Sequence, residues 1–546
     1  MLFSLIPPTS SVRETEPLIQ SLSRLEPSTS GSAGIEGDAA SANPKTFIDD
    51  VPDTKRQLGL LSAISLVFNG VIGTGVFAGA SIVLNSSGSV GMTFVMWILG
   101  ALVAAAGTAV YIELGTGLPR SGGEKVYLEY IYRRPAFMTS CVYALYGILS
   151  GWIAVPSIAF GEYALHALAY DPTPTNVRIV AFLCLTFCLV VHGAFLNFGI
   201  RLQNALGAFT TLVLVLIAGS GWLSLAGVPG FSVGEEYDQP NNFTWSTFWE
   251  DSNFGANAFV NGMYNVIWSY VGYSNANYAL SEVRDPVRTI KRAAPLAMFF
   301  VTFVYLAVNV AYFAVVSKAD MLGGGTIPAA LFFRNLYGPT TERILSTIIA
   351  LAMLASTLAG LFTQGRLVQE LGREGVLPYS SFFASNKPFN APFAGLFTRY
   401  IVSVLLMTFA PPGDAYLLLV NYYAYPLSLF NLLISGGLLL LYTQPFESYG
   451  WRPPFRAYKY VVVFFFISNM FLVVVPVIPP SAGFEPYEHL PYYSHIVFTL
   501  FVGLLGVVYW FIVFKWIPGR DGYELKQVTV NQDDGVTRNV FRAVRL

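Results

Sequence analysis

Apolar segments of about 20 residues follow one another along most of this chain, and their length constrains the fold more than any other feature. An α-helix needs about 20 apolar residues to cross the hydrocarbon core of a bilayer. Twelve such segments can be counted, over 57–82, 91–118, 136–168, 177–198, 203–227, 256–281, 294–316, 341–365, 394–411, 415–441, 459–479 and 492–516. The sequence therefore predicts an all-α polytopic membrane protein with 12 transmembrane helices.

The charge content argues against a soluble protein and against a nucleic-acid-binding protein. Only 12% of the 546 residues are charged, against about 25% in soluble proteins. The net charge is −1, and no basic block is long enough to indicate binding to nucleic acid. We therefore expect membrane lipid, and no nucleic acid, among the partners of the chain.

The hydropathy pattern divides the chain into four parts. Residues 1–56 are rich in Ser, Pro, Gly and acidic residues without periodicity, which is typical of a disordered tail. Residues 57–441 hold the first ten predicted helices and form the core. Residues 442–516 hold two further helices, and 517–546 form a short C-terminal tail.

The distribution of Lys and Arg predicts the orientation of the chain. The loops after even-numbered helices hold 16 of these residues, with Arg399 counted in the loop after the eighth helix. The loops after odd-numbered helices hold four. Since basic loops remain in the cytoplasm, we expect both termini on the cytoplasmic side.

Two of the predicted helices contain interruptions. Gly70, Gly73 and Gly75 lie close together in the first helix, and each glycine costs a helix about 1 kcal/mol relative to alanine. In the sixth helix, the polar segment Trp268–Asn277 forms the second interruption. A small-residue face that packs on another helix would also explain the first interruption. Interruptions at corresponding places in two halves favour instead an inverted-repeat transporter with its site at the bilayer midplane.

An interrupted helix offers chemistry that suits an α-amino acid. The break frees backbone N–H groups at the start of one half-helix and C=O groups at the end of the other. The N–H groups suit a carboxylate and the C=O groups suit an ammonium, and an α-amino acid carries both groups on one carbon. Thr74 adds a hydroxyl donor at the first break.

Four sets of motifs lie at fixed places among the predicted helices. They are Ile72–Phe77 in the first, Tyr111–Gly115 with Pro119–Glu124 after the second, Glu282–Pro286 with Arg288 and Pro295 after the sixth, and Gly365–Gly375 with Pro378 after the eighth. Together they resemble the amino acid–polyamine–organocation superfamily. Within it the chain is similar to the L-type amino acid transporters, and the segment 272–282 resembles the fungal high-affinity methionine permeases.

This resemblance implies a LeuT-like core of five plus five helices in inverted repeat, with helices 1 and 6 broken, followed by two peripheral helices. It implies that Ile72, Thr74 and Gly75 and the backbone around the sixth-helix break hold the α-groups, with Trp268 as an aromatic gate. Polar and aromatic residues of the tenth helix extend the predicted cavity. The predicted substrate-binding residues are Ile72, Gly73, Thr74, Gly75, Trp268, Ser269, Tyr270, Gly272, Tyr273, Asn277, Asn421 and Tyr425.

The chain departs from the family in two places. Animal L-type members have a cysteine after helix 3 that joins a glycoprotein partner, and the corresponding loop His166–Val177 has none. We therefore expect no disulfide-linked heavy chain. Many relatives also carry a lysine at a cation position in helix 5, and helix 5 of this chain has no lysine.

Ionisable and hydroxyl residues within or beside the predicted helices are candidates for ion coupling and gating, because a charge in the membrane is costly. For Glu113 and Glu282 a structural pair with a loop arginine is the alternative. For Glu162 it is a local pair with His166, and for a Ser-Thr pair it is a bond to the helix's own backbone. The candidates are Glu113, Glu162, Glu282, Arg284, Ser356, Thr357 and Arg366.

We expect an alternating-access permease that imports methionine, or a related neutral amino acid, across the plasma membrane by proton symport. A broad neutral amino acid permease or exchanger, and a membrane amino acid sensor, remain as alternatives. The chain lacks a nucleotide-binding loop, a nucleophile–base constellation and a cluster of metal ligands. We therefore expect no enzyme activity, no cofactor and no metal.

The N-terminal tail contains two lysines, Lys45 and Lys55. Their position on a flexible cytoplasmic segment makes them candidate acceptors for a ubiquitin ligase.

Overall fold

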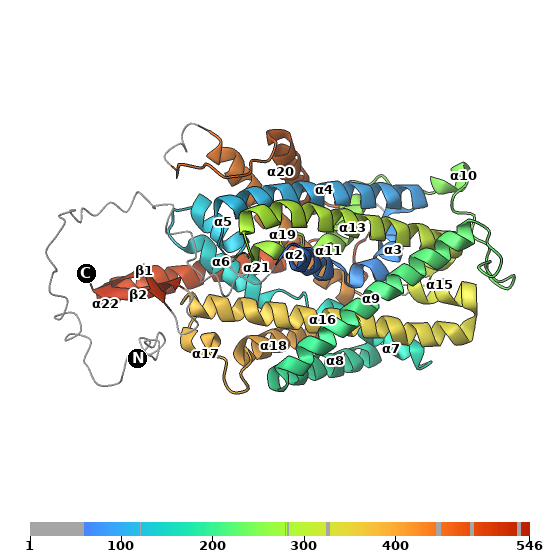
Figure 1. Cartoon of the computed structure of the whole chain (residues 1–546), viewed down its shortest axis with the longest axis horizontal. Helices are drawn as coiled ribbons and strands as arrows, with labels where there is room; N and C mark the ends of the chain where they lie inside the picture. Colours follow the sequence, from blue (N-terminus) through green and yellow to red (C-terminus); the bar gives the residue numbers. More distant parts are fainter. Residues whose placement is uncertain are drawn as a thin grey trace.

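The computed structural model describes residues 59–120, 122–278, 280, 283–323, 328–443, 449–480, 485–531 and 537–545. The predicted tail 1–56, with its two lysines, lies outside them. In the described part the chain is an elongated bundle of long helices, with most of their axes along its length (Figure 1). Nine helices there are long and apolar enough to span a bilayer, and Phe393–Phe409 is apolar but shorter. The chain is a polytopic helical membrane protein.

The elements follow the chain in a simple order. The first half contains α2 (Leu60–Val71), α3 (Thr74–Ser87), α4 (Val90–Gly117), α5 (Glu124–Ile131), α6 (Met138–Leu149), α7 (Ala154–Ala167), α8 (Pro174–Ala194), α9 (Leu196–Leu225), α10 (Trp245–Phe248), α11 (Ala256–Tyr270) and α12 (Asn275–Tyr278). The second half contains α13 (Pro286–Val315), α14 (Lys318–Gly323), α15 (Pro328–Tyr337), α16 (Pro339–Arg373), α17 (Ser380–Ala384), α18 (Phe393–Phe409), α19 (Ala415–Leu441), α20 (Lys459–Val474), η6 (Val475–Val477), α21 (Ser494–Phe511), η7 (Ile512–Trp516), α22 (Ile517–Asp521), β1 (Tyr523–Asn531) and β2 (Thr537–Arg545).

The first and sixth predicted helices are each interrupted in the structure. The first divides into α2 and α3, which are separated by Ile72 and Gly73 in extended conformations. The sixth divides into α11 and the short α12, with Val271 extended at the end of α11. Both interruptions fall where the sequence predicts them.

Several helices continue beyond the predicted apolar segments. The helix α16 runs to Arg373, so that Arg366 lies in a helix and not in a loop. The helix α13 begins at Pro286, after the side chain of Asp285 accepts a hydrogen bond from the Arg288 N–H. A helix satisfies its own backbone groups outside the membrane as well as inside it, so hydropathy alone makes these two helices too short.

The two ends of the bundle differ in the elements they carry. The helices α5 and α17 and the C-terminal strands lie at one end, which we call the hairpin end, whereas α10 and α15 lie at the other, which we call the outer end (Figure 1). The strands β1 and β2 pair antiparallel, with Tyr523 opposite Arg545. The prediction of an all-α chain with a plain tail at 517–546 is therefore wrong at the C-terminus.

The C-terminal hairpin is attached to the bundle by an aromatic side chain. The ring of Phe541 contacts Phe137, at a centroid distance of 4.6 Å, and Phe514, at 5.1 Å. The alternation of buried Tyr523 and Leu525 with exposed residues in β1 is the pattern of a half-buried strand. Burial of these apolar residues on the helix ends gives the hairpin its support.

Glu113 of α4 connects the core to the segment before α20. Its carboxylate is fully buried and accepts hydrogen bonds from the Tyr442 hydroxyl, from the Trp451 Nε1 at 3.0 Å and from the Ala457 N–H at 2.8 Å. In the described part of the chain these three uncharged donors replace the loop arginine considered from the sequence. Charge-assisted bonds of this kind are about twice as strong as neutral ones.

Replacement of Glu113 by Ala should therefore destabilise the protein. The change leaves an indole N–H and a backbone N–H buried without an acceptor, and we expect a loss of about 3 kcal/mol or more in the free energy of unfolding. The melting temperature of the detergent-purified protein measures this loss. The matched variant Glu524→Ala, at an exposed position of β1, should melt like the wild type, and equal melting temperatures for both variants would contradict the assignment.

Candidate functional site

The two interruptions meet in the middle of the bundle. The Trp268 Nε1 of α11 donates a hydrogen bond of 3.1 Å to the Thr74 hydroxyl at the start of α3. A Cβ atom added to Gly75 would lie only 2.1 Å from the Ser269 hydroxyl and 2.7 Å from the Ser269 Cα. The close approach of α3 to α11 therefore requires a glycine at position 75.

A second glycine contact lies on the hairpin side of the same crossing. Gly272 has a φ of +117°, a backbone conformation that side chains disfavour. A Cβ atom at this position would also lie 2.8 Å from the carbonyl oxygen of Gly70. Gly70 and Gly272, about 200 residues apart in the sequence, thus bring the two breaks into backbone contact.

The crossing exposes opposite ends of half-helices to the same region. The helix α3 begins at Thr74 without a side-chain cap, so its first N–H groups have no partner within the helix. The helices α2 and α11 both end there, with their carbonyl groups directed outward from the last turn. The crossing therefore combines a partly positive helix start with two partly negative helix ends.

Tyr305 of α13 connects the two helix ends, and the sequence analysis missed it. Its buried hydroxyl lies 2.8 Å from the Val71 carbonyl oxygen and 2.7 Å from the Ser269 carbonyl oxygen. A hydroxyl placed between two carbonyls satisfies part of the hydrogen-bonding demand that the breaks create. A tyrosine in an apolar helix gives no signal by which the sequence alone could have identified this contact.

A cavity of about 1050 Å³ extends from the crossing to the hairpin end. At its inner end it is lined by Ile72 of the first break and by Gly272 and Tyr273 of the second. Near the hairpin end it is lined by Glu124 of α5 and by the exposed Leu61 of α2. The cavity therefore connects the crossing with the surface on that side.

The third predicted helix is interrupted as well, which the sequence analysis did not predict. It divides into α6, which ends at Leu149, and α7, which begins at Ala154. Trp152 lies in this gap and lines the cavity. Its ring centroid lies 5.9 Å from that of Tyr423, with the rings stacked, and 6.4 Å from that of Trp268, edge to face. We call these three mutually packed rings the aromatic box; Trp152 and Tyr423 line the inner end of the cavity, and Trp268 packs against both.

A buried arginine holds the gap between α6 and α7. Arg399, which was counted with a loop in the sequence, lies in α18 and is fully buried. Its guanidinium donates to the carbonyl oxygens of Gly147 and Ile148 and, at 3.0 Å, to the Ser150 hydroxyl. A cation at the C-terminal end of a helix is favourable, so Arg399 stabilises the end of α6 and with it the position of the aromatic box.

The remaining predicted substrate-binding residues lie around the cavity or apart from it. Gly73, Thr74, Gly75, Trp268 and Ser269 lie at the crossing but are not among the cavity-lining residues. Tyr270 packs on Trp97 and Tyr305. Asn277 packs on Gly115 of α4, and Tyr425 packs on His495. The Asn421 side-chain amide donates hydrogen bonds to Asn261 and Tyr487.

The two neighbouring hydroxyl residues of α16, Ser356 and Thr357, make different contacts. The Ser356 hydroxyl faces the first break, 3.1 Å from where a Cβ of Gly73 would lie. The Thr357 hydroxyl donates to the Met353 carbonyl of its own helix, at 2.9 Å. Ser356 is thus the member of the pair that a ligand at the break would meet.

The other coupling candidates are spread over both ends of the bundle. Arg366 lines the cavity and its guanidinium lies over the Phe362 ring. Glu162 is half-buried in α7, where His166 lies 2.8 Å from Glu342 of α16. Arg284 is exposed, and Glu282 lies outside the described residues.

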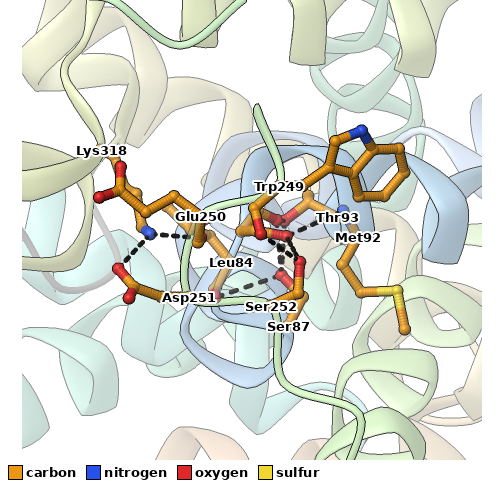
Figure 2. Close-up of polar contacts among 10 residues, drawn as sticks. Leu84, Ser87, Met92, Thr93, Trp249, Glu250, Asp251, Ser252 and Lys318 are labelled. Carbon is orange, nitrogen blue, oxygen red and sulfur yellow. Dashed lines mark hydrogen bonds and ion pairs between the residues drawn. The ribbon is translucent and has the colours of Figure 1, made fainter. Parts of the chain in front are cut away.

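The outer end is held by contacts between the 249–253 loop and its neighbours (Figure 2). Lys318 donates to the Glu250 carbonyl and to the Asp251 carboxylate, both at 2.9 Å. The Asn253 N–H donates to the Ser87 carbonyl at 2.8 Å, and the Ser252 hydroxyl lies 2.7 Å from that of Ser89. These bonds fix the loop on the turn between α3 and α4, on the opposite side of the crossing from the cavity.

Comparison with known proteins agrees with this architecture. The family model described as "Amino acid permease" matches residues 58–505. The chain is 41% identical over 493 residues to the high-affinity methionine permease of Saccharomyces cerevisiae, which covers 90% of this chain and 85% of the relative. It is 26% identical over 513 residues to the low-affinity methionine permease of the same yeast, covering 92% and 90%. It is 30% identical over 399 residues to the large neutral amino acids transporter small subunit 2 of Oryctolagus cuniculus, covering 72% and 71%. These relatives are transporters and not enzymes.

The crossing predicts a strong effect of Gly75→Ala. The added methyl group would collide with Ser269 and push α3 away from α11, and displacements of about 1 Å at a site can reduce activity by ~100-fold. We expect amino acid uptake to fall by at least about tenfold while the protein still reaches the cell surface.

Gly219→Ala in α9 is the matched control, because a Cβ there meets nothing within 4 Å. Its uptake should equal that of the wild type. Normal uptake by the Gly75→Ala variant would show that the two breaks do not need to approach this closely.

Proposed function

The chain belongs to the amino acid permease family, and on this premise we propose that it imports L-methionine across the plasma membrane by alternating access. The observation that carries the proposal is the crossing of the two breaks at the inner end of a cavity that extends to the hairpin end of the bundle. Such a crossing offers both halves of an amino acid zwitterion a partner at one place.

We propose that the substrate carboxylate binds the uncapped start of α3. The N–H groups that follow Gly73, together with the Thr74 hydroxyl, would donate to it, as helix starts do to other anions. The substrate ammonium would bind carbonyl groups at the ends of α2 and α11, near Ser269 and Tyr270. Tyr305 already occupies two of these carbonyls, so it would orient the ones that remain.

The side chain of the substrate would enter the aromatic box. Trp152 and Tyr423 line the cavity, and Trp268 packs against both rings. A thioether sulfur makes favourable contacts with aromatic rings at about 5 Å. The similarity to two yeast methionine permeases supports the same substrate. The size of the cavity and the similarity to a large neutral amino acids transporter favour a broader neutral amino acid permease as the second candidate.

We propose twelve membrane spans with a five-plus-five inverted repeat. The nine long spans, the shorter Phe393–Phe409 helix and the two interrupted pairs, α2–α3 and α11–α12, would supply them. The excess of basic residues at the hairpin end supports a cytoplasmic position for that end, and thus for both termini. The structure then corresponds to a state open to the cytoplasm and closed outside.

The proposed partners follow from the same surfaces. Large apolar side chains on the outside of the bundle, such as Phe299 and Phe501, are exposed and would contact lipid. The three cysteines are buried free thiols, which supports import without a disulfide-linked heavy chain. A ubiquitin ligase that acts on Lys45 or Lys55 remains a proposal from the sequence.

Uptake of radiolabelled L-methionine into proteoliposomes tests the proposal. We expect saturable uptake that unlabelled methionine competes for more strongly than leucine or phenylalanine does. Equal competition by all three would favour the broader permease. Binding of methionine without uptake would contradict import and indicate a sensor.

The aromatic box predicts a change of selectivity in Trp152→Ala. Removal of this ring enlarges the pocket, and a change of this kind in an apolar pocket alters discrimination by roughly tenfold or more. We expect the preference for methionine over phenylalanine to fall by about tenfold. Trp245→Ala, at an exposed position of the outer end, should leave the preference unchanged, and an unchanged preference in Trp152→Ala would exclude this ring from the pocket.

A further inference from the structure

Four carboxylates are buried in the described part of the chain, and three of them have at least one partner that is not a hydroxyl group. Asp414 accepts from the backbone N–H groups of Glu488 and His489, at 2.7 and 2.8 Å. Glu113 accepts from an indole, a backbone N–H and the Tyr442 hydroxyl, and Glu342 pairs with a histidine. Backbone and indole N–H groups only donate, so they cannot accept a hydrogen bond from Asp414 or Glu113.

Glu124 is the fourth buried carboxylate, and its partners are all hydroxyl groups. Its Oε1 accepts from the Ser274 hydroxyl at 3.2 Å, and its Oε2 accepts from the Tyr143 hydroxyl at 3.2 Å and from the Tyr278 hydroxyl. The two tyrosine hydroxyls also lie 2.9 Å from each other. The carboxylate is 3% exposed but lines the cavity.

A shell of hydroxyls can satisfy either protonation state of a carboxyl group. An ionised carboxylate can accept a hydrogen bond from each of the three hydroxyls around Glu124. A protonated carboxyl group donates one bond, and a hydroxyl can rotate to accept that bond because it carries two lone pairs. Backbone and indole N–H groups, such as two of the three donors to Glu113, cannot accept a hydrogen bond in this way.

The surroundings of Glu124 contain no competing cation in the described residues. The neighbouring Lys125 points to Glu374, which also pairs with Arg120 at 3.2 Å. The titratable groups that interact electrostatically with Glu124 are tyrosines from every element packed around it, namely Tyr111, Tyr127, Tyr143, Tyr273, Tyr278 and Tyr423. A proton on Glu124 therefore removes the charge of the cluster without breaking an ion pair.

Glu124 is also connected to the second break. Ser274 precedes α12, the short helix that follows this break, and Tyr278 is its last residue, whereas Glu124 and Tyr143 belong to α5 and α6. The carboxyl group of Glu124 thus holds α12 against α5 and α6. Its protonation would weaken that hold, because a neutral carboxyl group is a weaker acceptor than a carboxylate.

We propose that Glu124 is the proton-binding group that couples amino acid import to the proton gradient. This role rests on the proposed import of methionine. Protonation forms one O–H bond on the carboxylate while the carrier is open to the outside, and the proton leaves to water in the cavity once the hairpin end is open. No electrons are transferred, and one proton enters for each substrate.

The test uses the full-length protein in proteoliposomes with Glu124→Gln, Glu124→Asp and wild type. An inward gradient of about one pH unit supports roughly tenfold accumulation of methionine per coupled proton. The wild type and Glu124→Asp, which keeps a titratable group, should reach this ratio. Glu124→Gln should equilibrate methionine at a ratio of about 1 under the same gradient, while methionine counterflow, which needs no proton, continues.

Glu129→Gln is the matched control on the same helix, because Glu129 binds Ser140 and Gln527 away from the cavity. It should accumulate methionine like the wild type. Full gradient-driven accumulation by Glu124→Gln would overturn the proposal, as would loss of counterflow together with accumulation. Methionine import by the wild type that ignores the pH gradient would overturn the coupling role alone, whereas a wild type that imports no methionine would overturn the proposed function itself.

Discussion

The fold depends on one constraint, which is that backbone polar groups inside a membrane must find partners within the protein. This chain interrupts two helices at its centre and so leaves such groups without helical partners. The two interruptions lie against each other, with glycines at 75 and 272 where no side chain fits. The Tyr305 hydroxyl shares its one proton between two of the freed carbonyls, and a zwitterionic substrate would satisfy others. The hydrogen-bonding groups that the interrupted backbone leaves free thus match the charged groups of the proposed substrate.

Two kinds of contact hold the regions around the crossing. At the outer end, Lys318 and the 249–253 loop make bonds that close the bundle (Figure 2). Glu113 of α4 and Asp414 at the start of α19 are held by backbone or indole N–H groups, which cannot accept a hydrogen bond in return. Between these fixed regions lies the hydroxyl-lined Glu124, whose partners permit a change of charge. A carrier that alternates between two states needs contacts that stay fixed and contacts that can change.

The sequence predicted the parts of the structure that repeat simple physical rules. Apolar segment lengths gave the long helices, and the glycines of the first helix and the polar segment of the sixth gave the two breaks. The gap at Trp152 was not predicted, because it contains no cluster of glycines and depends on Arg399 from a helix about 250 residues away. Asn277 and Asn421 stay predicted substrate-binding residues, and their contacts with Gly115 and Tyr487 could not be predicted, since a residue type does not reveal which way a helix face turns. The C-terminal strands were missed because their support comes from Phe137 and Phe514, on distant elements.

The central claim is that substrate binds where the two breaks cross. A structure determined with L-methionine bound tests it most directly. The account predicts the α-carboxylate within about 3 Å of the backbone nitrogens at the start of α3, the ammonium at the carbonyl ends of α2 and α11, and the thioether among Trp152, Trp268 and Tyr423. Methionine bound elsewhere in the cavity, with the start of α3 unoccupied, would contradict it.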